Sequence, residues 1–212
     1  MKKIFVAYYI ILFLNQFSIS IFDFMYHKKL CWADHSRWKS RLSTHEDEWL
    51  FNSESLTKRL IRLSRNQFSL KRLSEQKQKI REDECGILEV GYPSLKQVRQ
   101  VVLEGQGQAW IYARSIILSK GEDLRGNLFQ AIGNKPLGSV LFQKDVFERS
   151  KIEITKYPRE LLPIDYRHVD LWARRSVFIC SSQSVLVQEV FLPDLWKHIV
   201  NKKKQVYNNY LL

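Results

Sequence analysis

Two β-rich runs joined by a short glycine-containing turn constrain the fold of this chain more than any other feature. The first run, VRQVVLEG, ends at Gly105, and the second, WIYARSIIL, begins at Trp110 beyond the turn GQGQ. Valine, isoleucine, tyrosine and tryptophan favour extended backbone, and two such runs across a turn of this kind form a β-hairpin. Because hairpin strands run in opposite directions, we expect a domain built on an antiparallel sheet.

Three later segments carry the same strand signal, and two others carry helix signals. Strands are predicted in KIEITKY, RRSVFIC and VLVQEVFLP. Leu56, Leu60 and Leu63 recur at helical spacing behind Ser55, which is a favourable N-cap residue. KPLGSVLF predicts a second helix with Pro136 at its first position. The expected fold class is therefore α+β, a single antiparallel β-sheet with helices on one side.

Four local expectations complete this outline. Thr44 followed by Asp47 resembles a capping box before WLF. GILEVGY is predicted as a short strand. Residues 69–84 are polar and basic without a clear apolar face, and we interpret them as a loop or a solvated helix. EDLRGNLFQAIG is predicted as a helix that stops at Gly133.

The composition indicates one globular domain with an anionic partner. The chain has 212 residues and 45% hydrophobic side chains, enough for one well-buried domain, and its net charge is +12. That charge favours nucleic acid, a membrane surface or a small polycarboxylate as the partner. The three cysteines are far apart without a CxxC pair, and the five histidines show no HExxH spacing. We therefore expect neither a disulfide framework nor a metal site.

The two ends of the chain differ in composition from the part between them. We expect residues 1–28 to be an apolar N-terminal segment, residues 29–196 to form the domain, and residues 197–212 to be a basic peripheral tail. Residues 4–22 carry no charge and are about long enough to cross a bilayer. This stretch fits a membrane anchor, a start codon assigned too early or a helix packed on the domain. It fits a cleaved signal less well, because no A-x-A-like cleavage site follows it.

Charged residues occupy positions that strand alternation places among apolar side chains. They are Arg99, beside Val101 and Leu103; Arg114, beside Trp110, Tyr112 and Ile116; and Glu189, beside Val185, Val187 and Phe191. A charged residue is rarely buried without a partner. Each is therefore an edge position, half of an internal ion pair or the wall of a polar ligand pocket, and three on neighbouring strands favour the pocket. Arg174 and Arg175 fall on opposite faces, and we expect one of them to pair with a carboxylate elsewhere.

The two predicted helix starts could add to an anion site. A helix N-terminus presents free N–H groups and the positive end of the helix dipole, which suits a carboxylate. The N–H groups near Leu56, after Ser55, and near Leu137, after Pro136, both qualify. Each is equally well explained as an ordinary helix cap.

Taken in order, these segments resemble a known enzyme family. The order is SLTKRL, VRQVVLEGQGQAWIYARSII, LFQAIGNKPLGSVLF, IEI, LWARRSVF and VLVQEVFLP. Over residues 49–193 this order is similar to the chorismate pyruvate-lyase family. The resemblance implies an enzyme that converts chorismate to 4-hydroxybenzoate and pyruvate, the first committed step of ubiquinone synthesis. It implies no cofactor or metal, an antiparallel sheet with helical flaps over an internal pocket, and a monomer.

The resemblance also implies roles for individual residues. Arg99 matches the arginine that binds the ring carboxylate, and the backbone N–H groups of Leu56 and Leu137 match those that help to hold it. Glu189 matches the glutamate that hydrogen-bonds the ring hydroxyl, so Arg99 and Glu189 are the expected catalytic residues. Arg114 matches a second arginine near the site and is the candidate for the enolpyruvyl carboxylate. The sequence departs from the family at Ala173, where glycine is usual, and at Lys135, where threonine is common.

Two other readings remain open at the sequence level. The ligand-sensing domain of GntR-type transcription regulators shares this fold by resemblance, but the segment before Trp49 is short and too apolar for a winged-helix domain. The basic run from Lys58 to Arg81 could face nucleic acid, yet no RNA-binding motif or interleaved aromatic residues support that partner. We expect an enzyme of the cytoplasm, where chorismate is made, with membrane contact if residues 4–22 are an anchor.

Overall fold

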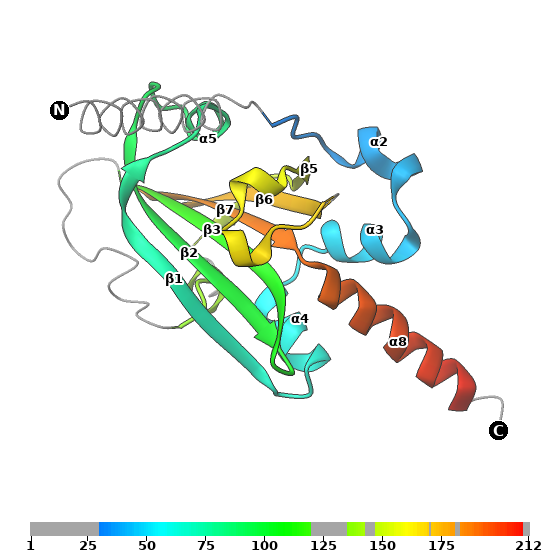
Figure 1. The fold of residues 1–212 in the computed structure, drawn as a ribbon. Coiled ribbons are helices and arrows are strands. Elements are labelled where there is room, and N and C mark those ends of the chain that lie inside the picture. Colours follow the sequence, from blue (N-terminus) through cyan, green and yellow to red (C-terminus); the bar gives the residue numbers. More distant parts are fainter. Residues whose placement is uncertain (1–29, 120–134, 143–146, 170, 181–182, 210–212) are drawn as a thin grey trace, which may run out of the picture.

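The computed structural model describes residues 30–119, 135–142, 147–169, 171–180 and 183–209. It shows one antiparallel β-sheet with helices packed against it, which confirms the expected α+β class (Figure 1). The strands are β1 (Phe68–Lys79), β2 (Leu95–Gly105), β3 (Gln108–Ser119), β4 (Glu148–Arg149), β5 (Glu153–Tyr157), β6 (Leu171–Cys180) and β7 (Gln183–Phe191). The helices are α2 (His35–Trp38), α3 (Thr44–Leu50), α4 (Leu56–Leu63), α5 (Glu82–Ile87), α7 (Gly138–Leu141) and α8 (Pro193–Asn209), with short 3-10 turns η1 (Lys39–Arg41), η2 (Arg159–Leu161) and η3 (Ile164–Tyr166).

Within the described residues the sheet has seven strands, in the order β1-β2-β3-β7-β6-β4, and β5 also pairs with β6. The predicted hairpin is confirmed as β2 and β3, and the three later strand predictions are confirmed as β5, β6 and β7. β4 pairs with the second half of β6 and β5 pairs with the first half, so both lie along the same edge. The middle of the sheet is therefore β3 and β7.

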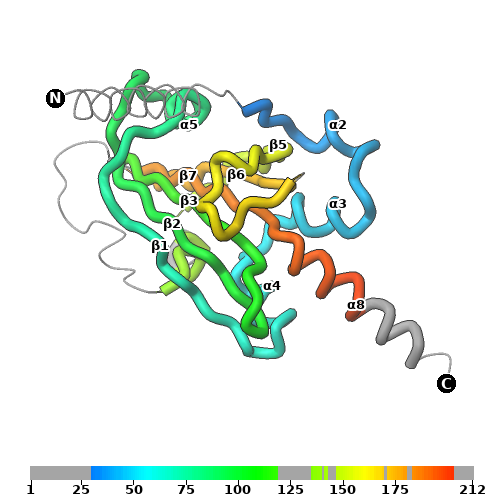
Figure 2. The backbone as a smooth tube through the Cα atoms, viewed as in Figure 1, coloured from blue at the N-terminus to red at the C-terminus, as the bar shows by residue number. Residues whose placement is uncertain are grey.

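Strand β1 corrects the prediction of a loop or solvated helix for residues 69–84. It is an edge strand that pairs with β2 along its length, and a register shift between Arg72 and Ser74 interrupts the pairing. Figure 2 shows β1 and β2 bending together along their length. The stabilisation comes from backbone hydrogen bonds to β2, whereas the side chains stay largely polar and half-exposed. A polar edge strand also discourages pairing with other molecules.

Helix α5 corrects the prediction of a strand in GILEVGY. Its first turn contains Glu82, Asp83 and Glu84, and acidic residues at a helix start are favoured by the dipole. The carboxylate of Glu84 also accepts a hydrogen bond from the backbone N–H of Arg81 at 2.8 Å. Cys85, which is buried, packs the helix against Val98 and Ile116 of the sheet. The helix therefore begins before the apolar residues that suggested a strand, and it ends at Ile87, where a turn follows.

The predicted helix caps are confirmed in one case and displaced in the other. Ser55 caps α4, and its hydroxyl accepts a hydrogen bond from the Lys58 N–H at 3.4 Å. The capping box of α3 is formed by Ser43 and Glu46 instead of Thr44 and Asp47. The helical prediction for KPLGSVLF is confirmed by the short α7, which begins at Gly138 and not at the predicted first position, Pro136. The helix predicted over residues 122–133 lies outside the described residues.

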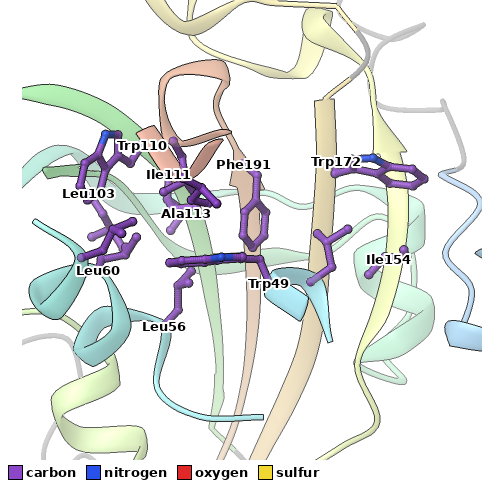
Figure 3. Close-up of a cluster of buried hydrophobic side chains, with 14 of the residues drawn as sticks. Trp49, Leu56, Leu60, Leu103, Trp110, Ile111, Ala113, Ile154, Trp172 and Phe191 are labelled. Atoms are coloured by element: carbon purple, nitrogen blue, oxygen red, sulfur yellow. The ribbon is translucent and has the colours of Figure 1, made fainter. Parts of the chain in front are cut away.

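One face of the sheet packs against α3, α4 and the first turns of α8. Figure 3 shows Trp49 and Leu56 from these helices converging on Ile111 and Phe191 of the sheet. Trp110 belongs to this cluster rather than to the face of Tyr112, because a register shift between Leu103 and Glu104 makes it an extra residue next to the turn. A Cβ on Gly105 would overlap the Trp110 ring, so the turn needs glycine there.

The structure extends the domain beyond the boundary expected at residue 196. Leu195 and Ile199 of α8 are 0% and 4% exposed and belong to the same core cluster as Trp49. The first turns of α8 therefore belong to the packed domain, even though the sequence beyond Ile199 is basic. The apolar segment of residues 4–22 lies outside the described residues. Among the described helices, none has both the length and the apolar character needed to cross a membrane.

Candidate active site

A cavity lies on the sheet face that carries α4, above two small side chains of the central strand β3. Ala113 and Ser115 alternate with larger residues that point to the other face, so this face is hollow at its centre. The walls come from β2, β7 and β6, and the cover comes from the starts of α4 and α7. Its lining includes Arg99, Val101, Leu103, Ala113, Ser115, Val187, Glu189, Arg174, Phe178, Arg149, Leu56, Thr57, Leu137, Gly138 and Phe142.

The starts of α4 and α7 meet at the cover of this cavity. A Cβ added to Gly138 would lie 3.2 Å from the Thr57 hydroxyl and 3.4 Å from that of Ser55, so glycine allows the close approach. Leu56 and Leu137 both line the cavity. The first N–H groups of a helix have no partner within the helix. The structure thus brings together the two backbone segments that the sequence predicted for carboxylate binding.

Arg99 reaches the same cavity from β2. Its side chain is 2% exposed, and one guanidinium nitrogen donates to the Lys135 carbonyl oxygen at 3.1 Å. The opposite strand residue is Glu75, with 3.6 Å between the Arg99 Nη1 and the Glu75 Oε2. Burial lowers the pKa of Arg99, and the Glu75 charge offsets this only in part. A guanidinium in this state gains from an anion placed against it.

Glu189 lies in the same cavity and is paired with Arg174. These residues face each other across β7 and β6, and the Arg174 Nε donates to the Glu189 Oε2 at 2.5 Å. Arg174 is 1% exposed and also donates to the carbonyl oxygens of Trp49, Leu50 and Asn52. Arg174 therefore fixes the Glu189 carboxylate and ties the segment after α3 to the sheet. The predicted separation of Arg174 and Arg175 onto opposite faces is confirmed.

Arg149 is a cavity residue that the sequence analysis did not identify. It belongs to the two-residue strand β4, and its Nε donates to the Ser176 hydroxyl at 2.8 Å. Its guanidinium carbon lies 5.2 Å from the centre of the Phe178 ring. Burial and the charge of Arg174 together lower the pKa of Arg149 to about 10. No periodic run or motif surrounds Arg149 in the sequence, so no clear signal marked it.

Arg114 does not line this cavity, whereas the resemblance placed it near the substrate. Strand alternation turns it to the opposite face, away from Ala113 and Ser115. There it is 6% exposed, and its guanidinium donates two hydrogen bonds to Glu84, at 2.7 and 3.1 Å. A bidentate pair of this kind leaves the guanidinium little capacity for a second carboxylate.

Arg114 belongs to a charged network buried between α5 and the sheet. Glu84 is its centre and also accepts from Arg81 at 2.8 Å and from the Gln188 amide at 3.2 Å. Burial opposes ionisation of Glu84, but the charges of Arg81 and Arg114 outweigh it and hold the pKa at about 2. The network therefore stays ionised at neutral pH and connects α5 to β3 and β7.

The cavity suits an aromatic or ring-shaped anion. Leu56, Val101, Phe178 and Val187 offer apolar surface for a ring, whereas the polar groups are arranged around it. Positive charge dominates, because three arginines face a single carboxylate in the described lining. Among the described residues, no cluster of three or more histidine, cysteine or acidic side chains has an arrangement that could hold a metal ion.

Comparisons with known proteins show the family of the chain. The family model described as chorismate lyase matches residues 28–201. A probable chorismate pyruvate-lyase of Pseudomonas fluorescens Pf-5 is 42% identical over 169 residues, covering 79% of this chain and 90% of that protein. One from Pseudomonas syringae pv. tomato DC3000 is 43% identical over 154 residues, covering 73% and 83%. Among solved structures, a possible transcriptional regulator of Bacillus subtilis matches with a TM-score of 0.39 and 12% identity, over 61% of this chain and 60% of that one.

Proposed function

This chain belongs to the chorismate lyase family, and we propose that it converts chorismate to 4-hydroxybenzoate and pyruvate as the first committed step of ubiquinone synthesis. The observation that carries the proposal is the meeting of Arg99, Leu56, Leu137 and Glu189 around one cavity. The relatives that are 42% and 43% identical over the aligned residues are named probable chorismate pyruvate-lyases.

Arg99 and the two helix starts form the proposed site for the ring carboxylate. A planar guanidinium can hold a carboxylate through two parallel hydrogen bonds. The N–H groups of Leu56 and Leu137 would donate to the same oxygens from the cover. Gly138 supports this arrangement because it lets the two helix starts approach each other. Chorismate and 4-hydroxybenzoate both carry this carboxylate, and both would bind here.

Glu189 is the proposed partner of the ring hydroxyl. Its Oε2 is held by Arg174, and its Oε1 accepts no hydrogen bond from any described residue. The side chain is 14% exposed, so Oε1 is directed into a largely enclosed space. A charged acceptor fixed in this way would orient the hydroxyl of chorismate and of 4-hydroxybenzoate at the end opposite to the carboxylate.

The reaction then needs positioning and charge stabilisation more than an added reagent. The carbinol carbon of the ring loses its hydrogen, the ether bond to the enolpyruvyl group breaks, and the ring becomes aromatic. The methylene carbon of the leaving group gains a hydrogen and becomes the methyl group of pyruvate, either by direct transfer from the ring carbon or by protonation of the released enolate. Cavity arginines stabilise negative charge on the departing enolate, and rigid groups at both ends hold the ring in a reactive orientation.

Turnover of chorismate by the purified protein tests the proposal. We expect 4-hydroxybenzoate and pyruvate to form in equal amounts without added metal or cofactor. Arg99→Ala should abolish most of the turnover, whereas Arg62→Ala, which removes a solvent-exposed arginine paired with Glu54, should not change it. Binding of 4-hydroxybenzoate without any turnover of chorismate would contradict the enzyme and would indicate a sensor of the same fold.

We also propose that the catalytic unit starts near residue 29 and resides in the cytoplasm. A protein that begins at Lys28 should fold and retain full activity, because the cavity is lined by residues from Leu56 onward. Loss of folding in that shortened protein would show that the apolar segment is part of the core. Sedimentation of the full chain with membranes, set against the shortened protein, would measure whether residues 4–22 act as an anchor.

A further inference from the structure

Arg149 is the cavity arginine that has no described carboxylate within ion-pair distance, although Glu189 acts on it from farther away. Arg99 has Glu75 across the strand pair, and Arg174 has Glu189. The contacts of Arg149 are instead neutral: the Ser176 hydroxyl at 2.8 Å and the Ser53 carbonyl oxygen at 3.1 Å. A half-buried cation whose hydrogen-bond partners are neutral, and which lies near the charge of Arg174, is costly unless an anion joins it. This difference suggests that the missing charge comes from a ligand.

The surroundings of Arg149 hold its guanidinium in place without neutralising it. Its Nε and Nη1 are occupied by the two serines, and it lies over the rings of Phe142 and Phe178, with 5.8 and 5.2 Å to their centres. Its Nη2 makes no hydrogen bond to any residue that the structure describes. The side chain is therefore oriented in advance, with donor capacity left on the nitrogen that the serines do not use.

The position of Arg149 places it across the cavity from Arg99. In the sheet order, β2 and β4 are separated by β3, β7 and β6. At about 4.8 Å per strand step, the two backbones lie about 19 Å apart. Both side chains line the same cavity, so their guanidinium groups lie closer to each other than the two backbones do. The space between them suits a ligand with an anionic group at each end.

The other arginines near the sheet are less suited to a second anion. Arg174 is already committed to Glu189 and to three backbone carbonyl oxygens. Arg114 lies on the opposite face and is paired with Glu84. We therefore propose that Arg149 binds the second carboxylate of the substrate, the one carried on the enolpyruvyl ether. This inference rests on the proposed function, which makes the substrate a dicarboxylate.

Arg149 also borders the open groove next to the cavity. Leu141, Phe142, Arg149 and Phe178 line both spaces, and the groove continues to Ser53 and Lys151. The enolpyruvyl end of the substrate would thus face the groove, and the aromatic end would remain enclosed near Arg99. Arg149 would discriminate between the dianionic substrate and the monoanionic aromatic product, which lacks the second carboxylate.

Binding of two matched ligands tests this role without turnover. The first is benzoate, and the second is benzoate carrying a carboxyvinyl ether at the meta position, which cannot aromatise further. Arg149→Met should raise the Kd of the dicarboxylate by about ten- to a hundredfold, the range for a lost charge-assisted hydrogen bond. It should raise the Kd of benzoate by less than about threefold. Arg149→Lys should recover part of the affinity, because it restores the charge but not the planar fork. Arg62→Met, at an exposed arginine, is the control and should change neither ligand.

The outcomes separate this inference from the proposed function. An equal loss of both ligands in the Met and Lys variants would show that Arg149 supports the fold, and unchanged affinity for both would show that it faces no ligand; either result overturns the inference. The KM for chorismate should rise in Arg149→Met in parallel with the dicarboxylate Kd. If the unsubstituted protein does not turn over chorismate, the proposed function fails, while the ligand comparison still measures the role of Arg149.

Discussion

Each face of the sheet carries three buried or half-buried arginines, yet the two faces use them differently. On the face under α5, Arg81, Arg114 and Arg175 are matched by Asp83, Glu84 and Glu153. On the cavity face, the described residues place Glu75 within ion-pair distance of Arg99 and Glu189 within ion-pair distance of Arg174. Burial alone does not separate the faces, because Arg99 is 2% exposed and Arg114 is 6% exposed. The two faces differ in the number of carboxylates that lie within ion-pair distance of their arginines.

The electrostatic consequence follows from that balance. Burial opposes the charge of Arg81 and Arg114, but Glu84 outweighs it and raises the pKa of both. Burial lowers the pKa of Arg99 and of Arg149, because their surroundings offer too little negative charge. One face is thus a completed ionic core, and the other is a site that an anion would complete. Arg175, at the rim, follows the second pattern.

The largest expected effect on stability is at Glu84. Glu84→Gln removes the charge shared by Arg81 and Arg114 and replaces one acceptor oxygen by an N–H donor. Leaving buried charges without their partner should cost about 3–5 kcal/mol in the free energy of unfolding. The measurement is urea denaturation, with Glu54→Gln as a matched control, because the Glu54–Arg62 pair is exposed and should contribute less than about 1 kcal/mol.

Acid titration checks the same network. The folded pKa of Glu84, about 2, lies below its value of 4.5 in the unfolded chain. Its contribution is therefore fully present above about pH 4.5 and is lost as the pH falls toward 2, by about 3 kcal/mol in all. The slope of stability between these pH values should be shallower in Glu84→Gln. An unchanged slope would contradict the ionised state of this carboxylate.

The next effect is on ligand binding, at Arg99. Arg99→Ala should reduce the binding free energy of 4-hydroxybenzoate by about 2–5 kcal/mol, as expected when one partner of a buried charged contact is removed. Its effect on stability should be much smaller than that of Glu84→Gln, since Glu75 is 3.6 Å away. Arg99→Lys should recover only part of the affinity. A large fall in the melting temperature with unchanged affinity would show that Arg99 holds the fold instead.

Much of this contrast was predictable, because periodicity reports which side chains share a face. The alternation correctly grouped Arg99 with Val101, and Glu189 with Val187, and both pairs line the cavity. It could not say which face of β3 is hollow, and the resemblance placed Arg114 near the site although the alternation grouped it with Tyr112, which lies on the other face. Ala113 and Ser115 were the available signal: two small residues on one face of a bulky strand leave room for a ligand.

The errors have a common physical cause. β1 is held by backbone hydrogen bonds to β2, and its polar side chains give no sign of this pairing. α5 is fixed by a buried hydrogen bond from Arg81 to Gln188 and a buried ion pair between Glu84 and Arg114, both of them to strands distant in the sequence. Arg149 reaches the cavity from a strand of two residues. Local patterns do not record contacts that depend on tertiary structure.

A smaller effect on binding is expected at Glu189. Glu189→Gln keeps a hydrogen-bonding group for Arg174, so the variant should fold and bind the ring, yet turn over more slowly. Glu189→Ala should lose about 1.5–3 kcal/mol of affinity for 4-hydroxybenzoate, as for a hydrogen bond to a charged group. Benzoate, which lacks the hydroxyl, should bind the parent and the alanine variant about equally, which completes a double-mutant cycle. Equal weakening of both ligands would make the role of Glu189 structural.

The smallest effect should be at the rim of the ionic core, where Glu153 accepts from the Arg175 Nε at 2.9 Å. The Glu153 side chain is 31% exposed, and Arg175 keeps other partners, the Asp83 carbonyl oxygen at 3.2 Å and the Trp32 ring at 4.6 Å. Glu153→Gln should therefore cost no more than about 1 kcal/mol in the free energy of unfolding. That cost should shrink at high salt, because exposed pairs are screened.

Urea denaturation of Glu153→Gln and of Glu84→Gln compares how much unfolding free energy each carboxylate of the network contributes. If burial of the shared carboxylate sets the cost, the rim variant is the milder one at every ionic strength, and activity per folded molecule is unchanged in both, since neither residue lines the cavity. A cost at Glu153 as large as that at Glu84 would mean that the face under α5 is one cooperative unit, in which exposure of a member does not lessen its contribution. The contrast between the faces would then rest on connectivity among charges rather than on how deeply each is buried.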